Sequence, residues 1–135
     1  MSAKIWLVCG ALLGGTAVAL GAYRAHGLET RLKAEAADDA AKAAIDKRLA
    51  DCETAVRYQM FHALALLIVG GLAERRGSKL LSAAAACFLL GTLLFCGPLF
   101  LASLFDVHLH WAVIPSGGAL LILGWAVLSL ACAQR

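Results

Sequence analysis

The sequence is poor in charge, since only 16% of its 135 residues are Asp, Glu, Lys or Arg, whereas 61% are hydrophobic and the mean hydropathy is +0.80. A soluble domain of this size leaves a large share of its residues on a polar surface and could not bury so much apolar area. This composition excludes an ordinary soluble enzyme, a disordered tail and a nucleic-acid module. The sequence therefore predicts a membrane protein that contacts the lipid bilayer and no nucleic acid.

The sequence also lacks motifs that would identify a reaction. Its five cysteines form no C-x-x-C pair, so neither a disulfide framework nor a zinc site is expected. There is no catalytic triad, phosphate loop or metal signature. We therefore expect no catalytic residues, no metal, no cofactor and no enzymatic activity.

Four long runs contain no Asp, Glu, Lys or Arg, and they cover residues 5–23, 58–73, 80–105 and 107–134. A helix needs about 20 apolar residues to cross a hydrocarbon layer of about 30 Å. The runs lack the period-2 alternation of barrel strands, which leaves helices as the spanning element. The prediction is one all-α domain over residues 1–135, a four-helix transmembrane bundle with spans at about 5–23, 55–73, 80–104 and 114–133.

The segment joining the first two spans, at about residues 28–54, is rich in alanine and charge. Acid-before-base pairs such as Glu29 with Lys33 and Asp38 with Lys42 support a helix. This helix is either a solvated connection or a docking surface for a partner outside the membrane.

Four spans put both termini on the same side as the loop that carries Arg75, Arg76 and Lys79. The opposite loop around Asp106 has no Lys or Arg. Short basic loops tend to stay in the cytoplasm, so both termini are predicted to be cytoplasmic.

Glycines recur in the spans at positions that let helix backbones approach closely. They predict tight packing within the bundle or against another subunit. The glycines assigned to helix packing are Gly10, Gly14, Gly21, Gly91, Gly117, Gly118 and Gly124.

Four spans also place every histidine toward the same membrane face, where the sequence predicts a polar cluster. Tyr58, Gln59 and His62 share a face of the second span. Polar groups are expensive to expose to lipid, so they should face the bundle interior, a cavity or the interface. The cluster is a structural network, a proton or small-solute pathway, or a metal, haem or quinone site. Its predicted members are His26, Arg57, Tyr58, Gln59, His62 and Asp106.

Four stretches resemble the YgdD/YwdK-like family of small four-span bacterial inner-membrane proteins of unknown function, which has a relative in animal mitochondria. They are GAYRAHGL at 21–28, TAVRYQMFHALALL at 54–67, FLLGTLLFCG at 88–97 and PSGGALLILGW at 115–125. The resemblance implies four helices in a bacterial inner membrane. It implies no activity, substrate or cofactor.

These features together predict an accessory, assembly or interaction subunit that packs against itself, as a homo-oligomer, or against a larger membrane complex. Small-residue helix faces and a charged connecting helix are features of interaction. The alternative function is a small channel or transporter for protons or a small solute that uses Arg57 and His62.

Overall fold

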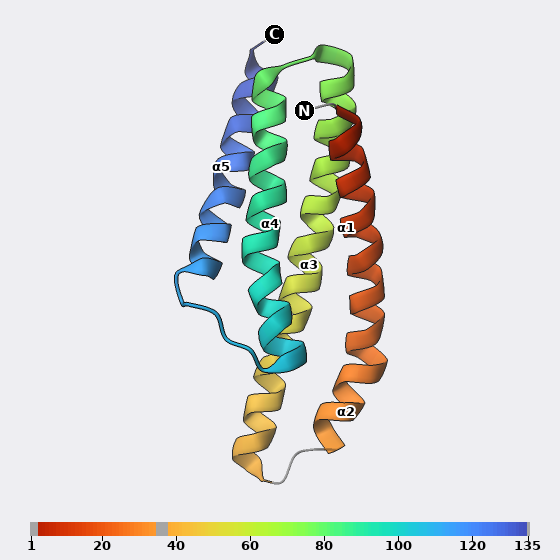
Figure 1. Cartoon of the computed structure of the whole chain (residues 1–135), viewed down its shortest axis with the longest axis vertical. Coiled ribbons are helices and arrows are strands. Elements are labelled where there is room, and N and C mark those ends of the chain that lie inside the picture. The colour runs from red at the N-terminus through yellow and green to blue at the C-terminus, as the bar shows by residue number, and fades with distance from the viewer. Residues whose placement is uncertain (1–2, 35–37, 135) are drawn as a thin grey trace.

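The computed structural model describes residues 3–34 and 38–134, and these form helices joined by short connections (Figure 1). No strand occurs among them, and four of the helices are long and apolar enough to cross a membrane. The predicted all-α fold with four spanning helices is confirmed. The elements are α1 (Ala3–Tyr23), a π-helical turn η1 (Arg24–Leu28), α2 (Glu29–Ala34), α3 (Asp39–Arg76), α4 (Lys79–Phe105) and α5 (Val113–Ala133).

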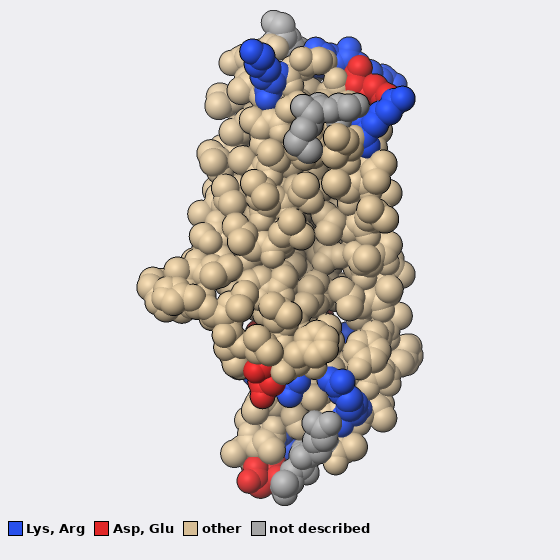
Figure 2. Space-filling view, in the orientation of Figure 1, with Lys and Arg blue, Asp and Glu red and all other residues tan. Residues whose placement is uncertain are grey.

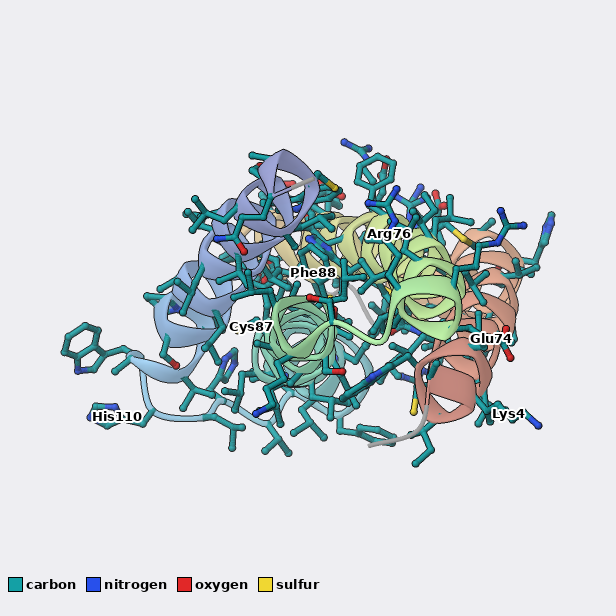
Figure 3. The ribbon with its side chains drawn as sticks, turned by 90° about the horizontal axis from the view of Figure 1, so that it is seen from above. Lys4, Glu74, Arg76, Cys87, Phe88 and His110 are labelled. Carbon is teal, nitrogen blue, oxygen red and sulfur yellow. The ribbon has the colours of Figure 1, made fainter. Side chains whose placement is uncertain are left out.

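The four long helices form a row in the order α1, α3, α4, α5, with α1 and α5 at its two ends when viewed from above (Figure 3). Only 17% of the apolar stretch is buried in each of α1 and α5, against 44% in α3 and 39% in α4. The inner helices therefore form the core, and the outer helices turn most of their apolar surface outward. Both ends of the chain lie at the end where α3 turns into α4 (Figure 1).

Charged side chains on the face drawn in Figure 2 gather toward the two ends of the molecule, and a broad band between them is without charge. The main core is formed by residues from all four long helices. A satisfactory apolar interior requires close side-chain packing rather than hydrophobicity alone. The buried members of this main core are Trp6, Ala65, Leu66, Val69, Ala73, Leu81, Ala85, Phe88 and Leu121.

Helix α3 is a single helix of 38 residues, so residues 39–54 of the connecting segment are continuous with the second span. At 1.5 Å per residue it is about 57 Å long, well beyond the thickness of a hydrocarbon layer. The Asp38 side chain caps its start by accepting a hydrogen bond from Ala41 N at 2.7 Å. Its end is set by Gly77, which adopts the left-handed conformation with φ of 59°.

A second, smaller core joins the connecting segment to the end of α4. Its buried residues come from η1, α2 and the first half of α3, and they are Leu28, Leu32, Ile45, Leu49 and Cys52, packed against Phe100 and Leu104. The apolar side of the charged segment is thus covered, while its polar side is exposed. The segment is folded against the bundle and is more than a solvated link.

Two arginines fix this segment to the carboxyl end of α4. The guanidinium of Arg48 donates to Ser103 O from Nε at 3.1 Å and from Nη2 at 2.9 Å, and Arg31 Nη2 donates to Leu104 O at 2.8 Å. The last carbonyls of a helix have no partner within it and carry the negative end of the helix dipole. Arg31 and Arg48 therefore cap α4 from two other helices.

We expect Arg48→Met to lower the stability of the detergent-solubilised protein by about 1–2 kcal/mol, because it leaves the buried Ser103 carbonyl unpaired and removes a cation from a helix carboxyl end. A thermal melt measures this. The matched control is Lys47→Met, since Lys47 is exposed and pairs only along its own helix with Asp51. Such a pair contributes about 0.3–0.5 kcal/mol. Equal losses in the two variants would contradict the capping role.

The π-helical turn η1 begins directly after the first span. There the ring of Tyr23 lies over Gly27, where an added Cβ would stand 2.6 Å from Tyr23 Cε2. Glycine at this position is what allows the ring to lie against the backbone. Such π turns within α-helices often mark functional positions.

Candidate functional site

His62 lies inside the bundle at 5% exposure, about one helical turn into the uncharged run 58–73 of α3. Its Nδ1 is 2.8 Å from the backbone carbonyl oxygen of Tyr58, and its Nε2 is 3.3 Å from the indole Nε1 of Trp125 on α5. A carbonyl only accepts and an indole N–H only donates. The ring is therefore neutral, with its proton on Nδ1 and its lone pair on Nε2.

Aromatic rings surround this imidazole. The ring centroid of His62 is 5.6 Å from that of Phe88 and 6.2 Å from that of Trp125, and those two rings stand edge to face at 5.0 Å. Such pairs add about 0.5–1.5 kcal/mol beyond area burial. His62 on α3 thus contacts both α4 and α5. Its contact with Trp125 joins α3 to α5 through side chains.

Gln59 performs the corresponding role toward α1. It is buried, and its Nε2 donates to Leu13 O and to Thr16 Oγ1, each at 2.8 Å. An amide nitrogen has two hydrogens, so one side chain satisfies both bonds. Gln59 therefore fixes the register of α3 against α1.

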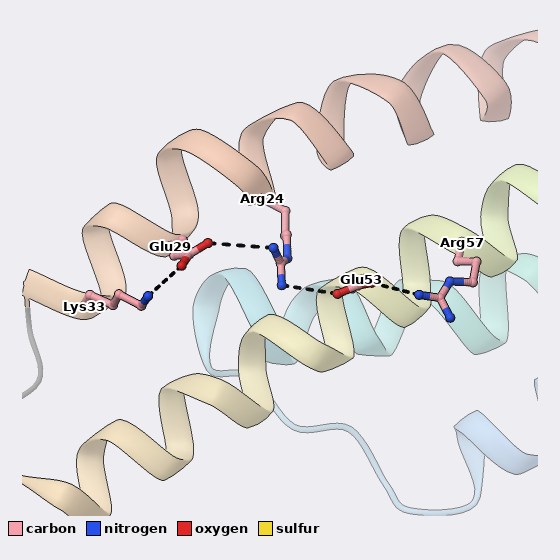
Figure 4. Close-up of polar contacts among 5 residues, drawn as sticks. All are labelled: Arg24, Glu29, Lys33, Glu53 and Arg57. Carbon is pink, nitrogen blue, oxygen red and sulfur yellow. Dashed lines mark hydrogen bonds and ion pairs between the residues drawn. The ribbon is translucent and has the colours of Figure 1, made fainter.

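Arg57 belongs to a chain of ion pairs that joins η1 and α2 to α3 (Figure 4). Glu53 accepts from Arg57 Nη2 at 2.8 Å and from Arg24 Nη2 at 3.3 Å. Glu29 lies 3.8 Å from Arg24 and 2.6 Å from Lys33. The hydrogen bond from Lys33, together with its charge, lowers the pKa of the Glu29 carboxyl. Three cations and two carboxylates leave this chain with an excess of one positive charge.

The structure does not bring His26 or Asp106 to His62. His26 is exposed at the end of the first span, and its carbonyl accepts from Thr30 Oγ1 at 2.9 Å. Asp106 is exposed beyond α4, where it pairs with His108 at 3.2 Å. Tyr58, in contrast, contacts His62 through its carbonyl and through its ring, which stacks on the imidazole with centroids 6.2 Å apart. The same Tyr58 ring is tilted against that of Phe95, with centroids 4.9 Å apart. The predicted set therefore divides into an inner group around His62, the separate Gln59 bond, the Arg57 ion pairs, and exposed outer groups.

Sequence reasoning did not name several residues that complete these groups. Most of these contacts join residues far apart along the chain, so no local spacing marked them. The exception is the pair of Glu53 with Arg57, whose i,i+4 spacing could have indicated it. Within residues 3–34 and 38–134, no three His, Cys, Asp or Glu side chains are grouped as a metal site would need. The residues missed were Arg24, Arg31, Arg48, Glu53 and Trp125.

The predicted packing glycines differ in how closely they approach a neighbour. At five of them an added Cβ would lie within 3.2 Å of another helix, whereas Gly14 and Gly118 have only ordinary contacts at 3.8 and 3.7 Å. The closest approach is at Gly117, which faces the backbone of α4. The five close positions are Gly10, Gly21, Gly91, Gly117 and Gly124.

A sequence profile described as "Protein of unknown function (DUF423)" matches residues 20–118. The chain belongs to this family. The matched range includes the π turn, the Arg57 ion pairs, Gln59 and His62, and it stops before Trp125. Membership establishes a membrane protein family and indicates no catalytic one.

Curated relatives of this DUF423 protein are called UPF0382 membrane proteins. The chain is 36% identical to one from Staphylococcus epidermidis over 95% of its own length and 94% of the relative's. It is 32% identical to YwdK of Bacillus subtilis, over 97% of its own length and 98% of that protein's. It is 35% identical to a Haemophilus influenzae protein, over 92% of its own length and 90% of that protein's. The predicted resemblance to the YgdD/YwdK-like family is confirmed. No solved structure matches the chain.

Proposed function

We propose that this protein is a non-enzymatic accessory or interaction subunit of a bacterial inner membrane, which contacts a second copy of itself or a larger membrane complex. One observation supports this most directly. The charged segment formed by α2 and residues 39–54 is packed against α4 by its own small core and by the arginine caps. A merely connecting loop would need neither.

The exposed side of this charged segment is the proposed contact surface. Lys42, Asp39 and Lys47 have side chains that are 64%, 98% and 73% exposed. Mixed charges on a rigid support give specificity through electrostatic complementarity more than they give affinity. Because α3 is far longer than one bilayer crossing, this surface is proposed to stand outside the membrane.

Native mass analysis of gently solubilised protein tests the proposal. We expect a defined complex that persists in the wild type and is lost in the double variant Lys42→Glu with Lys47→Glu. The matched control reverses two charges at the other end of the molecule, by Arg75→Glu with Arg76→Glu, and should retain the complex. The measured mass distinguishes a homo-oligomer from a larger assembly. A monomer in every sample would contradict the proposal.

The second candidate function is a channel or transporter, and the position of His62 within a span favours it. Ionisable residues within spans often mark ion or solute pathways. Both ring nitrogens of His62 are, however, already engaged by Tyr58 and Trp125. Flux measured in reconstituted vesicles decides between the two functions, since reproducible proton or solute transport by the purified protein would overturn the accessory role.

The orientation is a further part of the proposal, with both termini in the cytoplasm. Cys52 is fully buried and is therefore a poor reporter. We expect a single cysteine introduced by Ala43→Cys, an exposed position in α3, to react with a membrane-impermeant maleimide in intact cells when the five native cysteines are replaced. Reaction only after permeabilisation would show the opposite orientation.

A further inference from the structure

A groove runs along the outer surface between α3 and α5, on the side where these two helices meet only through side chains. Its volume is about 580 Å³, within the range of about 300–1,000 Å³ typical of small-molecule sites. The groove opens laterally, toward the side of the molecule that faces lipid in a spanning protein. Its lining residues are Arg57, Tyr58, Phe61, His62, Leu64 and Trp125.

The walls of this α3–α5 groove are apolar and accessible. Phe61, Leu64 and Trp125 are each about half exposed, so they are available to a ligand that enters from the side. The polar atoms of His62 are already paired with Tyr58 O and with Trp125 Nε1. Apart from the Tyr58 hydroxyl and the Arg57 guanidinium, a ligand in the groove therefore meets rings and methyl groups, which suits a hydrocarbon chain better than a polar solute.

One end of the groove is positively charged. Arg57 is the last charged residue of α3 before the uncharged run 58–73, which places its side chain at the expected boundary of the hydrocarbon layer. Its partner Glu53 is shared with Arg24, and the whole ion-pair chain of Figure 4 keeps one excess positive charge. The Arg57 side chain is 59% exposed and can reach an anion at the mouth of the groove.

The distance along α3 between Arg57 and His62 matches the step from the headgroup level of a membrane into its hydrocarbon region. His62 is five residues beyond Arg57, or about 7.5 Å deeper along the helix. The groove thus extends from a cation at the headgroup level to an aromatic floor within the hydrocarbon region. We propose that the α3–α5 groove binds an anionic phospholipid, whose phosphate pairs with Arg57 and one of whose acyl chains lies against Phe61, Leu64 and Trp125.

This proposal does not depend on the accessory function. The test uses the full-length protein in vesicles of phosphatidylcholine that contain a minor fraction of phosphatidylglycerol with a diazirine in its acyl chain. After illumination, we expect adducts concentrated on the segments that contain Phe61, Leu64 and Trp125. An even spread over the outward faces of α1 and α5 would overturn the proposal.

Variants distinguish the contribution of the Arg57 charge from that of the acyl-chain contacts. Arg57→Gln should lower the adduct yield in the groove about fivefold, which is the contribution of one arginine near an anionic membrane surface. The matched control Arg75→Gln removes an equal charge at the other end of the protein and should change the groove yield little. An equal loss in the two variants would show general attraction to the membrane and would overturn the site.

Leu64→Trp fills the groove and should lower the yield from the phosphatidylglycerol probe and from a phosphatidylcholine probe alike. The wild type should favour the phosphatidylglycerol probe, and a lack of preference would contradict the role of Arg57. Inorganic phosphate in excess should not compete, because it has no acyl chain. Full competition by phosphate would identify an anion site and overturn the lipid proposal. Helicity and melting temperature confirm that each variant is folded.

Discussion

Gly117→Ala should lower the stability of the detergent-solubilised protein by about 1–3 kcal/mol, the usual cost of forcing an extra methyl group into a packed interior. A Cβ at Gly117 would lie 2.5 Å from Phe95 N and 2.7 Å from Leu94 C, which are backbone atoms of α4. Backbone atoms cannot turn aside as the tip of a side chain can. The two helices would have to separate, and α5 is held almost entirely by α4.

The neighbouring residue provides the control. Gly118→Ala introduces the same methyl group, but its nearest neighbours are the ring atoms of Phe95 at 3.7 Å or more, an ordinary contact. Alanine also favours a helix over glycine by about 1 kcal/mol, so this variant should be neutral or slightly stabilised. A thermal melt in detergent compares the two variants. If Gly117→Ala melted at or above the temperature of Gly118→Ala, the close helix approach would be refuted.

His62→Ala should also destabilise the protein, by about 1–3 kcal/mol from the unpaired partners that it leaves behind. The indole N–H of Trp125 would lose its acceptor, and the space left among Phe88, Tyr58 and Trp125 would add a cavity cost. Thermal melting in detergent measures the loss. A ligand-binding role alone predicts a different result, namely little change in the ligand-free protein together with loss of ligand retention.

A double-mutant cycle isolates the bridge between α3 and α5. Trp125→Phe removes the indole N–H while keeping an aromatic ring, so it should cost less than His62→Ala. In the double variant the costs should fall short of additive, because contacting residues share one interaction. Strict additivity of the two single changes would argue against the bridge.

The candidate site was only partly predictable from the sequence. Tyr58, Gln59 and His62 could be grouped because helical spacing places them one turn apart or side by side. Their partners could not, since Trp125 lies on α5 and Leu13 on α1, far away along the chain. The expected proximity of Asp106 and His26 followed from topology alone. Sharing one membrane face did not bring their side chains to His62.

The sequence by itself determined that the protein is a helical membrane protein with four spans, because long uncharged runs have one stable form in lipid, with every backbone group bonded within its own helix. It also indicated the family through contiguous stretches of residues. Only the tertiary structure decided the row order of the helices, the folding of the charged segment onto α4 through Arg31 and Arg48, and the neutral state of His62. These depend on side chains from distant segments meeting at particular distances, and uniform apolar runs carry little information about which faces will meet.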